Sequence, residues 1–331
     1  MQDVAEFAQV SKMSVSRVFN NKPGVAEDTR QRIFDAIEQL GYEPTPDTSS
    51  SGNDFRLIGV LVPDISNFFF GEILNGVSKT AEKLNYGLVL YTQGLENNPQ
   101  RNSHFISLVN TKLIDGVLLL IPRGYELFDN FLTESNVPHV IIGHQTMVED
   151  EFSITVTNRK GMHEAVRHLL ALGHRRIGFI TGRMDIKCSH DRLDGYQDGL
   201  AEVGLPFEPE LVLEGDYQQT SGFQNTCDLL AMENPPTAIL ASNDLMAFGA
   251  MDAAKTAGLT IGKDISIIGF DDIKLAAQSY PPLTTVRQPM ATMGEAALDT
   301  LAMLLEGRTM LTPHRVLPTE LIVRETTGHA P

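Results

Sequence analysis

The sequence predicts a small all-α headpiece, a short linker, and an α/β core of two doubly wound parallel-sheet lobes. Residues 3–40 show apolar stripes at helical spacing, and residues 45–56 are rich in Pro, Ser, Gly and Asp. From Leu57 onward, short continuous apolar runs alternate with helical patterns, which is typical of parallel sheets covered on both faces. A length of 331 residues is also more than one compact core accommodates.

The headpiece begins with two short helices at a tight turn. Their apolar stripes are Val4, Ala5 and Ala8 in the first helix and Val15, Val18 and Phe19 in the second. Ser11 stands at the start of the second helix, where its side chain can cap free N–H groups. A third helix is expected over Glu27–Leu40, ended by Gly41. Its apolar stripe is Ile33, Ile37 and Leu40.

The second helix presents a polar face with cationic side chains. This face carries Lys12, Met13, Ser14, Ser16, Arg17 and Asn20. Taken alone, it fits either a solvated surface on an ordinary helical pair or a surface that enters the major groove of DNA. In the groove, Lys12 has the chemistry to bond guanine O6 and N7, and Met13 to contact a thymine methyl group.

The whole run from Asp3 to Pro44 favours the DNA interpretation. It reads D-V-A-x-x-A-x-V-S-x-x-S-V-S-R-V-x-N-x-x-x-x-V-x-x-x-T-R-x-R-I-x-x-A-I-x-x-L-G-Y-x-P and resembles the DNA-binding headpiece of the LacI/GalR family of bacterial transcription regulators. The resemblance implies a helix-turn-helix headpiece over residues 1–44 and a periplasmic-binding-protein-like core. Gln9 occupies the turn between the helices, where the family usually has Gly, so a strained left-handed backbone is expected there.

Charge limits how such a headpiece binds DNA. The formal net charge is −16, and the first 46 residues carry five cations against seven acids. Non-specific attraction to phosphates is therefore expected to be weak and salt-sensitive. Tight binding to a double-stranded DNA operator then requires base contacts and two headpieces acting together. We therefore expect a homodimer, with a tetramer as the alternative assembly.

The linker, residues 45–56, departs from the family. Members usually have Ala-Arg-x-Leu here, in a hinge helix that forms on DNA and places leucines in the minor groove. This linker has no Ala or Leu and consists of poor helix formers, with Phe55 as its one large apolar side chain. We therefore expect a flexible or extended linker, atypical as a hinge.

The core is expected to form two Rossmann-like lobes. Strands are predicted at Leu57–Val62, Gly87–Tyr91, Gly116–Ile121, Val137–Ile142, Arg176–Ile180, Thr237–Ala241 and Ile265–Gly269, with helices between them. By the resemblance, the chain crosses between the lobes three times, near Thr157, Arg287 and Thr312. The lobes then comprise residues 57–157 plus 288–312 and residues 158–287 plus 313–331. The last strands, Val316–Leu317 and Leu321–Val323, are assigned to the second lobe.

Ligands of such sheets bind beyond the carboxyl ends of the strands. The resemblance implies an effector pocket there, formed by Phe69, Phe70, Arg192, Tyr217, Asn243, Asp271 and Gln288. Plainer interpretations exist: the two phenylalanines as core, Arg192 as a surface ion pair, and Asn243 as a helix cap. The expected effector is a small sugar or sugar-like metabolite. A purine or nucleoside is the chemical alternative, because aromatics with Arg and Asp also suit a base. His144 stands where many members have an acid, which weakens the transfer of any one member's specificity to this chain.

Other classes of protein fit the sequence less well. No dinucleotide or P-loop glycine motif and no paired catalytic histidines are present, so neither an enzyme nor a cofactor is expected. Two cysteines, Cys188 and Cys227, suit a reducing cytoplasm and make no zinc site. The N-terminus lacks a secretory signal and the chain lacks a run of about 18 apolar residues, so no membrane association is expected.

The sequence therefore predicts a cytoplasmic, ligand-responsive transcription regulator of the repressor type, located at the nucleoid when bound to DNA. The alternative is a cytoplasmic small-molecule sensor whose DNA binding is weakened or lost, because the headpiece is acidic and the hinge is atypical.

Overall fold

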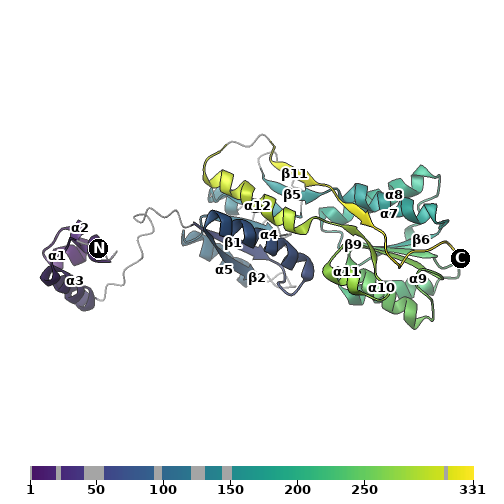
Figure 1. Ribbon diagram of the computed structural model, residues 1–331, viewed down its shortest axis with the longest axis horizontal. Helices are drawn as coiled ribbons and strands as arrows, with labels where there is room; N and C mark the ends of the chain where they lie inside the picture. Colours follow the sequence, from purple (N-terminus) through teal and green to yellow (C-terminus); the bar gives the residue numbers. More distant parts are fainter. Residues whose placement is uncertain are drawn as a thin grey trace. The chain divides into compact units, whose positions relative to one another are not determined.

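The computed structural model of the chain divides into two compact units, Met1–Asp54 and Phe55–Pro331 (Figure 1). It describes residues 2–19, 24–40, 56–92, 99–120, 131–143, 151–308 and 312–331. Residues 45–55 of the predicted linker, residues 121–130 between the predicted strands Gly116–Ile121 and Val137–Ile142, and His144 lie outside the described residues.

The first unit is a three-helix headpiece. Its helices are α1 (Gln2–Phe7), α2 (Lys12–Phe19) and α3 (Glu27–Leu40). Its small core consists of Val4, Ala5, Ala8, Val15, Val18, Ile33 and Ala36. All of these except Ala36 belong to the predicted apolar stripes. The expectation that Leu40 belongs to the apolar stripe of α3 is wrong, because this residue is 42% exposed. Leu40 is the last residue of α3, beyond the helical turns that carry the buried Ile33 and Ala36.

Two predictions about the turn between α1 and α2 are confirmed. Gln9 adopts a φ of +52°, the left-handed backbone that usually favours glycine. The Ser11 hydroxyl accepts a hydrogen bond from the Ser14 amide at 3.1 Å and so caps α2.

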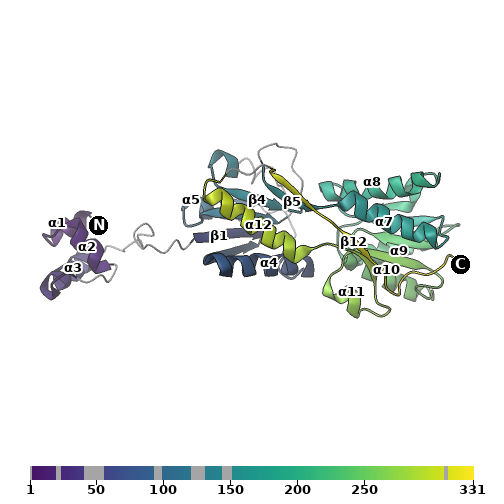
Figure 2. The ribbon, with the colours of Figure 1, turned by 45° about the horizontal axis from the view of Figure 1, so that its top comes forward.

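The first lobe of the second unit is built on a six-stranded parallel sheet in the order β11-β5-β4-β3-β1-β2. Its strands are β1 (Arg56–Val62), β2 (Tyr86–Thr92), β3 (Gly116–Leu120), β4 (His139–Ile142), β5 (Ser153–Val156) and β11 (His314–Leu317). Helices α4 (Phe68–Leu84) and α12 (Met290–Leu305) lie along one face (Figures 1 and 2). Helix α5 (Pro99–Asn110) packs on the other face. In β1, Val60 packs in the apolar cluster on the α4 and α12 face, and Leu61 packs in the cluster on the α5 face. A continuous apolar strand therefore requires helices on both sides of the sheet.

Glycines bring α4 and α12 into backbone contact. A Cβ on Gly76 in α4 would lie 1.9 Å from the carbonyl oxygen of Ala291, and one on Gly294 in α12 would lie 2.1 Å from that of Ile73. Only glycine therefore permits this helix spacing.

The second lobe is built on a second six-stranded sheet in the order β12-β10-β9-β8-β6-β7. Its strands are β6 (Ile177–Thr181), β7 (Val212–Glu214), β8 (Ala238–Ala241), β9 (Ser266–Asp271), β10 (Thr284–Arg287) and the antiparallel edge strand β12 (Glu320–Ile322). Helices α7 (Asn158–Ala171) and α8 (Lys187–Glu202) cover one face. Helices α9 (Gln219–Leu230) and α10 (Asp244–Thr256) cover the other, and the short α11 (Lys274–Gln278) follows β9.

The chain passes between the two sheets at Thr157, at Gln288–Pro289 and at Pro318–Thr319. The first two positions agree with the prediction. The third does not, and the assignment of Val316–Leu317 to the second lobe is wrong. These residues belong to β11, which pairs in parallel with β5 of the first sheet, Leu317 opposite Val156. Only two residues separate β11 from β12, so hydropathy alone does not reveal that the two strands lie in different sheets.

Among the helices of the described residues, none combines the length and the apolar composition that a membrane span requires.

Candidate functional site

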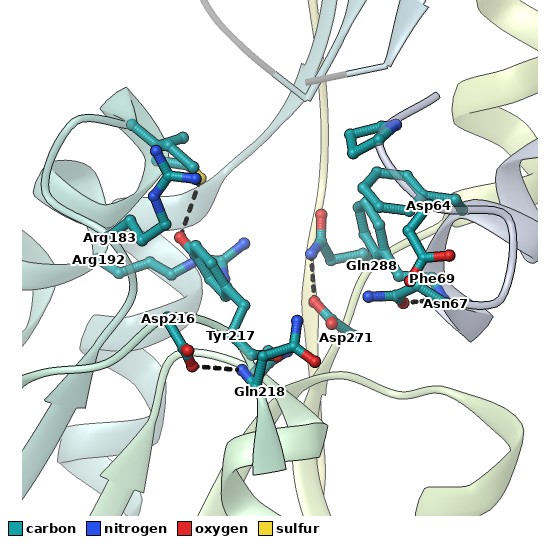
Figure 3. Close-up of a pocket in the computed structure, with 15 residues that line it drawn as sticks. Asp64, Asn67, Phe69, Arg183, Arg192, Asp216, Tyr217, Gln218, Asp271 and Gln288 are labelled. Atoms are coloured by element: carbon teal, nitrogen blue, oxygen red, sulfur yellow. Dashed lines mark hydrogen bonds between the residues drawn. The ribbon is translucent and has the colours of Figure 1, made fainter. Parts of the chain in front are cut away.

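A cavity lies between the two lobes, beyond the carboxyl ends of the strands (Figure 3). The structure brings all the residues predicted for the effector pocket to its wall. They are Phe69, Phe70, Arg192, Tyr217, Asn243, Asp271 and Gln288. The phenylalanines come from the first lobe and Gln288 from the second crossing, while the other four come from the second lobe.

Arg192 is a buried cation rather than a surface ion pair, since its residue is only 4% exposed. Its Nε donates to Oδ1 of Asn158 at 2.9 Å, and its Nη1 donates to the carbonyl oxygen of Ser242. Its guanidinium carbon lies 3.8 Å from the centre of the Phe270 ring, a cation–π arrangement. These contacts fix the planar group at the cavity wall, where its remaining N–H groups suit ligand oxygens.

Asp271 is aimed into the cavity by an unusual backbone. It ends β9 with a φ of +126°, and Asp272 follows with a φ of +58°. Two consecutive non-glycine residues in the left-handed region store strain of the kind found at binding sites. The Asp271 carboxylate accepts a hydrogen bond from Nε2 of Gln288 at 2.7 Å. The second crossing between the lobes is thus bonded directly to the pocket acid.

Burial raises the pKa of Asp271 to about 7, against the charge of Arg192 and the hydrogen bond from Gln288, which both lower it. Asp244 behind it is also fully buried, and its pKa is raised by burial first and by the neighbouring Asp271 second. Asp244 accepts from the Thr285 hydroxyl at 2.5 Å and from the Ile273 amide at 2.8 Å. Asp244 thus holds the loop after β9, whereas Asp271 is the acid that faces the cavity.

Tyr217 contributes its ring to the cavity and turns its hydroxyl into the wall. The hydroxyl lies 2.6 Å from Oγ of Ser189 and 3.5 Å from Sγ of Cys188. A Cβ on Gly182 would lie 2.0 Å from the Tyr217 ring, so glycine at this position makes room for it. Burial raises the pKa of the Tyr217 hydroxyl well above its usual value, which keeps the phenol neutral.

Asn243 carries out the plainer, structural role at least in part. Its side-chain oxygen accepts from the Met246 amide at 2.9 Å and caps α10. Its side-chain nitrogen donates to the carbonyl oxygen of Tyr217 at 3.0 Å. Both ends of the amide are therefore engaged by the protein, although the side chain lines the cavity.

The first lobe supplies the apolar wall. Phe69 and Phe70 make an edge-to-face pair with ring centres 5.4 Å apart, while Phe68 is 50% exposed and does not line the cavity. Asn67 caps α4 by accepting from the Phe69 amide at 2.9 Å, which fixes the start of this helix at the cavity. An apolar wall facing Arg192 and Asp271 suits a ligand with one apolar face and one edge of hydrogen-bonding groups.

The predicted DNA-binding face of the headpiece is open in the parts that the structure describes. Lys12 and Arg17 are exposed, and Met13 is 68% exposed despite being apolar. Ser14 is half-buried, and its hydroxyl lies 2.9 Å from that of Ser11. The side chain of Ser16 and the whole of Asn20 lie outside the described residues.

Comparisons with known proteins decide the family. Residues 1–45 match the model of the lacI family of bacterial regulatory proteins, and residues 166–327 match a periplasmic binding protein-like domain. The HTH-type transcriptional repressor CytR of Escherichia coli K12 is 36% identical over 100% of this chain and 97% of its own length. Catabolite control protein A of Priestia megaterium is 32% identical over 98% of each chain. The chain belongs to the LacI family.

Solved structures of the LacI family share the fold over nearly the whole chain. A lac repressor dimer bound to operator and the anti-inducer ONPF superposes with a TM-score of 0.77, 29% identity and 98% coverage of both chains. A complex of the transcriptional regulator CelR with cellobiose gives the same three values. The chain is therefore a ligand-responsive transcription regulator of the LacI family rather than an enzyme.

Several residues at the cavity of this LacI-family chain are not among those predicted from the sequence. They are Pro63, Asp64, Asn67, Arg183, Ile186, Cys188, Asp216 and Gln218. Asp64, Arg183 and Asp216 each follow a strand within two residues of its end, so the strand-end rule already points to them. Ile186 and Cys188 lie at the start of α8, and no sequence pattern distinguishes them from ordinary helix residues.

Proposed function

We propose that this LacI-family chain is a homodimeric transcriptional repressor whose two headpieces bind a palindromic operator. We propose further that a small sugar or sugar-like effector, held in the cavity between the lobes, switches that binding. By this account the protein works in the cytoplasm and is located at the nucleoid when bound to DNA.

The observation that carries this proposal is the way the two charged pocket residues are held. Arg192 is hydrogen-bonded to Asn158 beside the first crossing, and Asp271 is hydrogen-bonded to Gln288 at the second. An effector that engages these side chains acts directly on segments that set the relative orientation of the lobes. Differential affinity for two lobe orientations is what allosteric control requires.

The dimer and the sugar effector have support from relatives. The lac repressor relative is a dimer bound to operator, and the CelR relative is bound to cellobiose. In this chain, Arg192 and Asp271 offer the donors and acceptor that sugar hydroxyls need, while Phe69 and Phe70 suit the apolar face of a sugar ring. The same set suits a purine or nucleoside, which is the alternative effector. In the proposed complex with DNA, the headpiece surface that faces the bases consists of Lys12, Met13, Ser14, Ser16, Arg17 and Asn20.

A second candidate function is a sensor with weakened or lost DNA binding. The excess of acids over cations in residues 1–46 and the poor helix formers in residues 45–56 favour it. The two functions differ in what selection from random duplex DNA yields at low and moderate salt. The repressor predicts an enriched palindrome with half-sites about one or two helical turns apart. No enrichment at either salt would reject the repressor and leave the sensor.

The effector is tested separately, by thermal shift with D-ribose, cellobiose, adenosine and adenine. A sugar effector raises the unfolding temperature with ribose or cellobiose and not with adenine, because a ligand that binds only the folded state stabilises it. A shift with adenine or adenosine alone would replace the sugar by the purine or nucleoside alternative.

A further inference from the structure

An ion pair joins the two lobes beside the cavity. Nζ of Lys274, in α11 of the second lobe, lies 2.6 Å from Oε1 of Glu72, in α4 of the first lobe. The Glu72 side chain is 25% exposed and that of Lys274 is 72% exposed. Glu72 is three residues beyond Phe69, and Lys274 three residues beyond Asp271, so each partner lies close in the chain to a residue of the cavity wall.

Apolar packing supports this ion pair on the second-lobe side. Ile273, which precedes Lys274, is 2% exposed and belongs to the same apolar cluster as Phe69, Phe70 and Ile73 of the first lobe. Leu275, which follows Lys274, packs against that cluster too. Lys274 therefore lies between two side chains that pack with apolar residues of the opposite lobe.

The same segment is anchored in its own lobe. The Ile273 amide donates to Oδ2 of the buried Asp244 at 2.8 Å, and Asp272 accepts from Arg287 at 2.7 Å and from Arg324 at 2.6 Å. The loop from Asp271 to Lys274 is thus held firmly in the second lobe. A movement that separates the lobes must break the Glu72–Lys274 pair and expose Ile273.

We propose that Glu72 and Lys274 form an interlobe latch which, together with the packing of Ile273, holds the cavity closed when no effector is bound. An exposed ion pair contributes little on its own, so the latch biases the equilibrium between closed and open lobes without locking it. The consequence for regulation rests on the proposed function: the latch then sets how much of the repressor is closed before an effector arrives. The latch itself does not depend on that function.

The two cysteines of the chain allow a test without effector or DNA. Cys188 lines the cavity and is 6% exposed, while Cys227 in α9 is exposed and lies outside the cavity-lining set. The rate at which N-ethylmaleimide alkylates Cys188, measured by mass spectrometry of its peptide, reports how often the cavity opens. The rate at Cys227 in the same sample is the internal reference.

Reversing one charge places two like charges at the latch. Lys274→Glu and Glu72→Lys are each expected to speed Cys188 alkylation by about three- to tenfold relative to Cys227, as the loss of a pair and its replacement by repulsion implies. The double variant Glu72→Lys/Lys274→Glu restores the pair in reverse and should return the rate to within about twofold of the parent. Lys263→Glu, the same charge change at an exposed position elsewhere in the second lobe, should leave the rate unchanged.

Two results would overturn the proposed latch. One is that Cys188 is alkylated at the parental rate in both single variants. The other is a double variant that reacts as fast as the faster single one, which would mean that the two charges act independently. A fall in the thermal midpoint identifies a variant that has partly unfolded. In that case Lys274→Met, which removes one charge without adding repulsion, serves as the milder variant. We expect it to increase the Cys188 alkylation rate by less than Lys274→Glu does. Failure of the DNA selection or of the effector screen leaves this readout unaffected, so the two proposals fail separately.

Discussion

Nε of Arg192 donates to Oδ1 of Asn158 across 2.9 Å, which ties the buried cation of the pocket to the first crossing between the lobes. Nδ2 of Asn158 in turn lies 3.4 Å from the carbonyl oxygen of Val156, the last residue of β5 in the first lobe. One amide thus contacts the pocket with its oxygen and the opposite lobe with its nitrogen. Because Asn158 is 4% exposed, water does not readily replace either partner.

Threonines bind the first and third crossings to each other. The hydroxyls of Thr157 and Thr319 lie 2.8 Å apart, and the Thr319 amide donates to the Thr157 hydroxyl at 2.9 Å. We therefore expect a displacement of Asn158 to act on two of the three crossings. This connection gives a physical route from effector binding to lobe orientation, with a bonded element at each step.

Asn158→Ala should reduce the coupling between effector binding and DNA binding more than it weakens the binding of either ligand. Without the Asn158 oxygen, Arg192 can bind the effector without moving the crossing. We expect the ratio of operator Kd values, with saturating effector and without it, to fall about fivefold or more toward one. Fluorescence anisotropy with the selected duplex measures this ratio. Arg159→Ala, at the next residue but with a 59% exposed side chain, is the control and should keep the parental ratio.

The same experiment can reject the route. If Asn158→Ala lowers the unfolding temperature but retains the parental ratio at saturating effector, Asn158 is only structural.

Effector affinity should depend on pH through Asp271. Its pKa of about 7 lies above that of an ordinary carboxyl, so the empty pocket takes up a proton as pH falls through 7. An effector that donates hydrogen bonds to the carboxylate prefers the deprotonated form. We therefore expect affinity to be highest at pH 8 and to be about tenfold lower at pH 6. Isothermal titration calorimetry between pH 6 and pH 8 measures this dependence.

Asp271→Asn is the matched variant for this titration, since it keeps the shape and removes the ionisable group. It should bind more weakly at pH 8 and show no change with pH over the same range. A parental pH profile in this variant would assign the titration to another group.

The same pKa shift predicts a stability effect of definite sign. The folded-state pKa of Asp271 is raised above the unfolded value, so the folded state binds more protons between these two values, and the stability contributed by this group is lost as pH rises through about 7. Asp271→Asn should therefore raise the unfolding temperature of the ligand-free protein at pH 8 and have a smaller effect at pH 5. Calorimetry measures the unfolding temperatures of both proteins at pH 8 and pH 5. An equal shift at the two pH values would contradict the assignment of this titration to Asp271.

Two glycines of α4 provide a matched test of the first-lobe packing. Gly76→Ala places a Cβ 1.9 Å from the carbonyl oxygen of Ala291, so α4 and α12 must separate and a loss of about 1–3 kcal/mol is expected. Gly71→Ala, on the same helix, meets nothing within 4 Å and should stabilise by up to about 1 kcal/mol. Urea unfolding of both variants measures the difference, and equal effects would mean that the helix contact is looser than the structure shows.

Lys12→Ala tests whether α2 is the recognition helix. Lys12 is exposed at the first position of α2, where a recognition helix meets base edges. We expect a loss of discrimination of about 1–3 kcal/mol at one base pair of each half-site, with other positions unaffected. Selection repeated with the variant reveals this as one relaxed position. A uniform loss at every position would instead place Lys12 on phosphate.

The sequence predicts the fold wherever hydropathy has a clear period. Continuous apolar runs such as Leu57–Val62 and Ile265–Gly269 correspond to buried strands β1 and β9. Strand β10, Thr-Thr-Val-Arg, is too polar to be recognised in this way, and β7 is only three residues long. The sheet that β11 joins depends on pairing with β5, more than 150 residues away in the chain, which no local pattern specifies.

The pocket residues are predicted better than the residues that connect them. Asp271 and Arg192 stand at recognisable family positions, and Asp271 also follows a strand. Asn158 is different, because its role depends on the approach of α8 to the start of α7. Glu72 and Lys274 are likewise ordinary helix residues until the lobes are placed together. Contacts of this kind arise from tertiary structure and leave no signal in sequence spacing.

The decisive measurement is the operator affinity of the full-length protein with and without its effector, for the parent and for Asp271→Asn. We expect saturating effector to change the parental operator Kd by about 5- to 150-fold. At the concentration that saturates the parent, Asp271→Asn should show little change, while its operator Kd without effector stays parental. An operator Kd that the bound effector leaves unchanged in the parent would show that the cavity between the lobes does not control DNA binding.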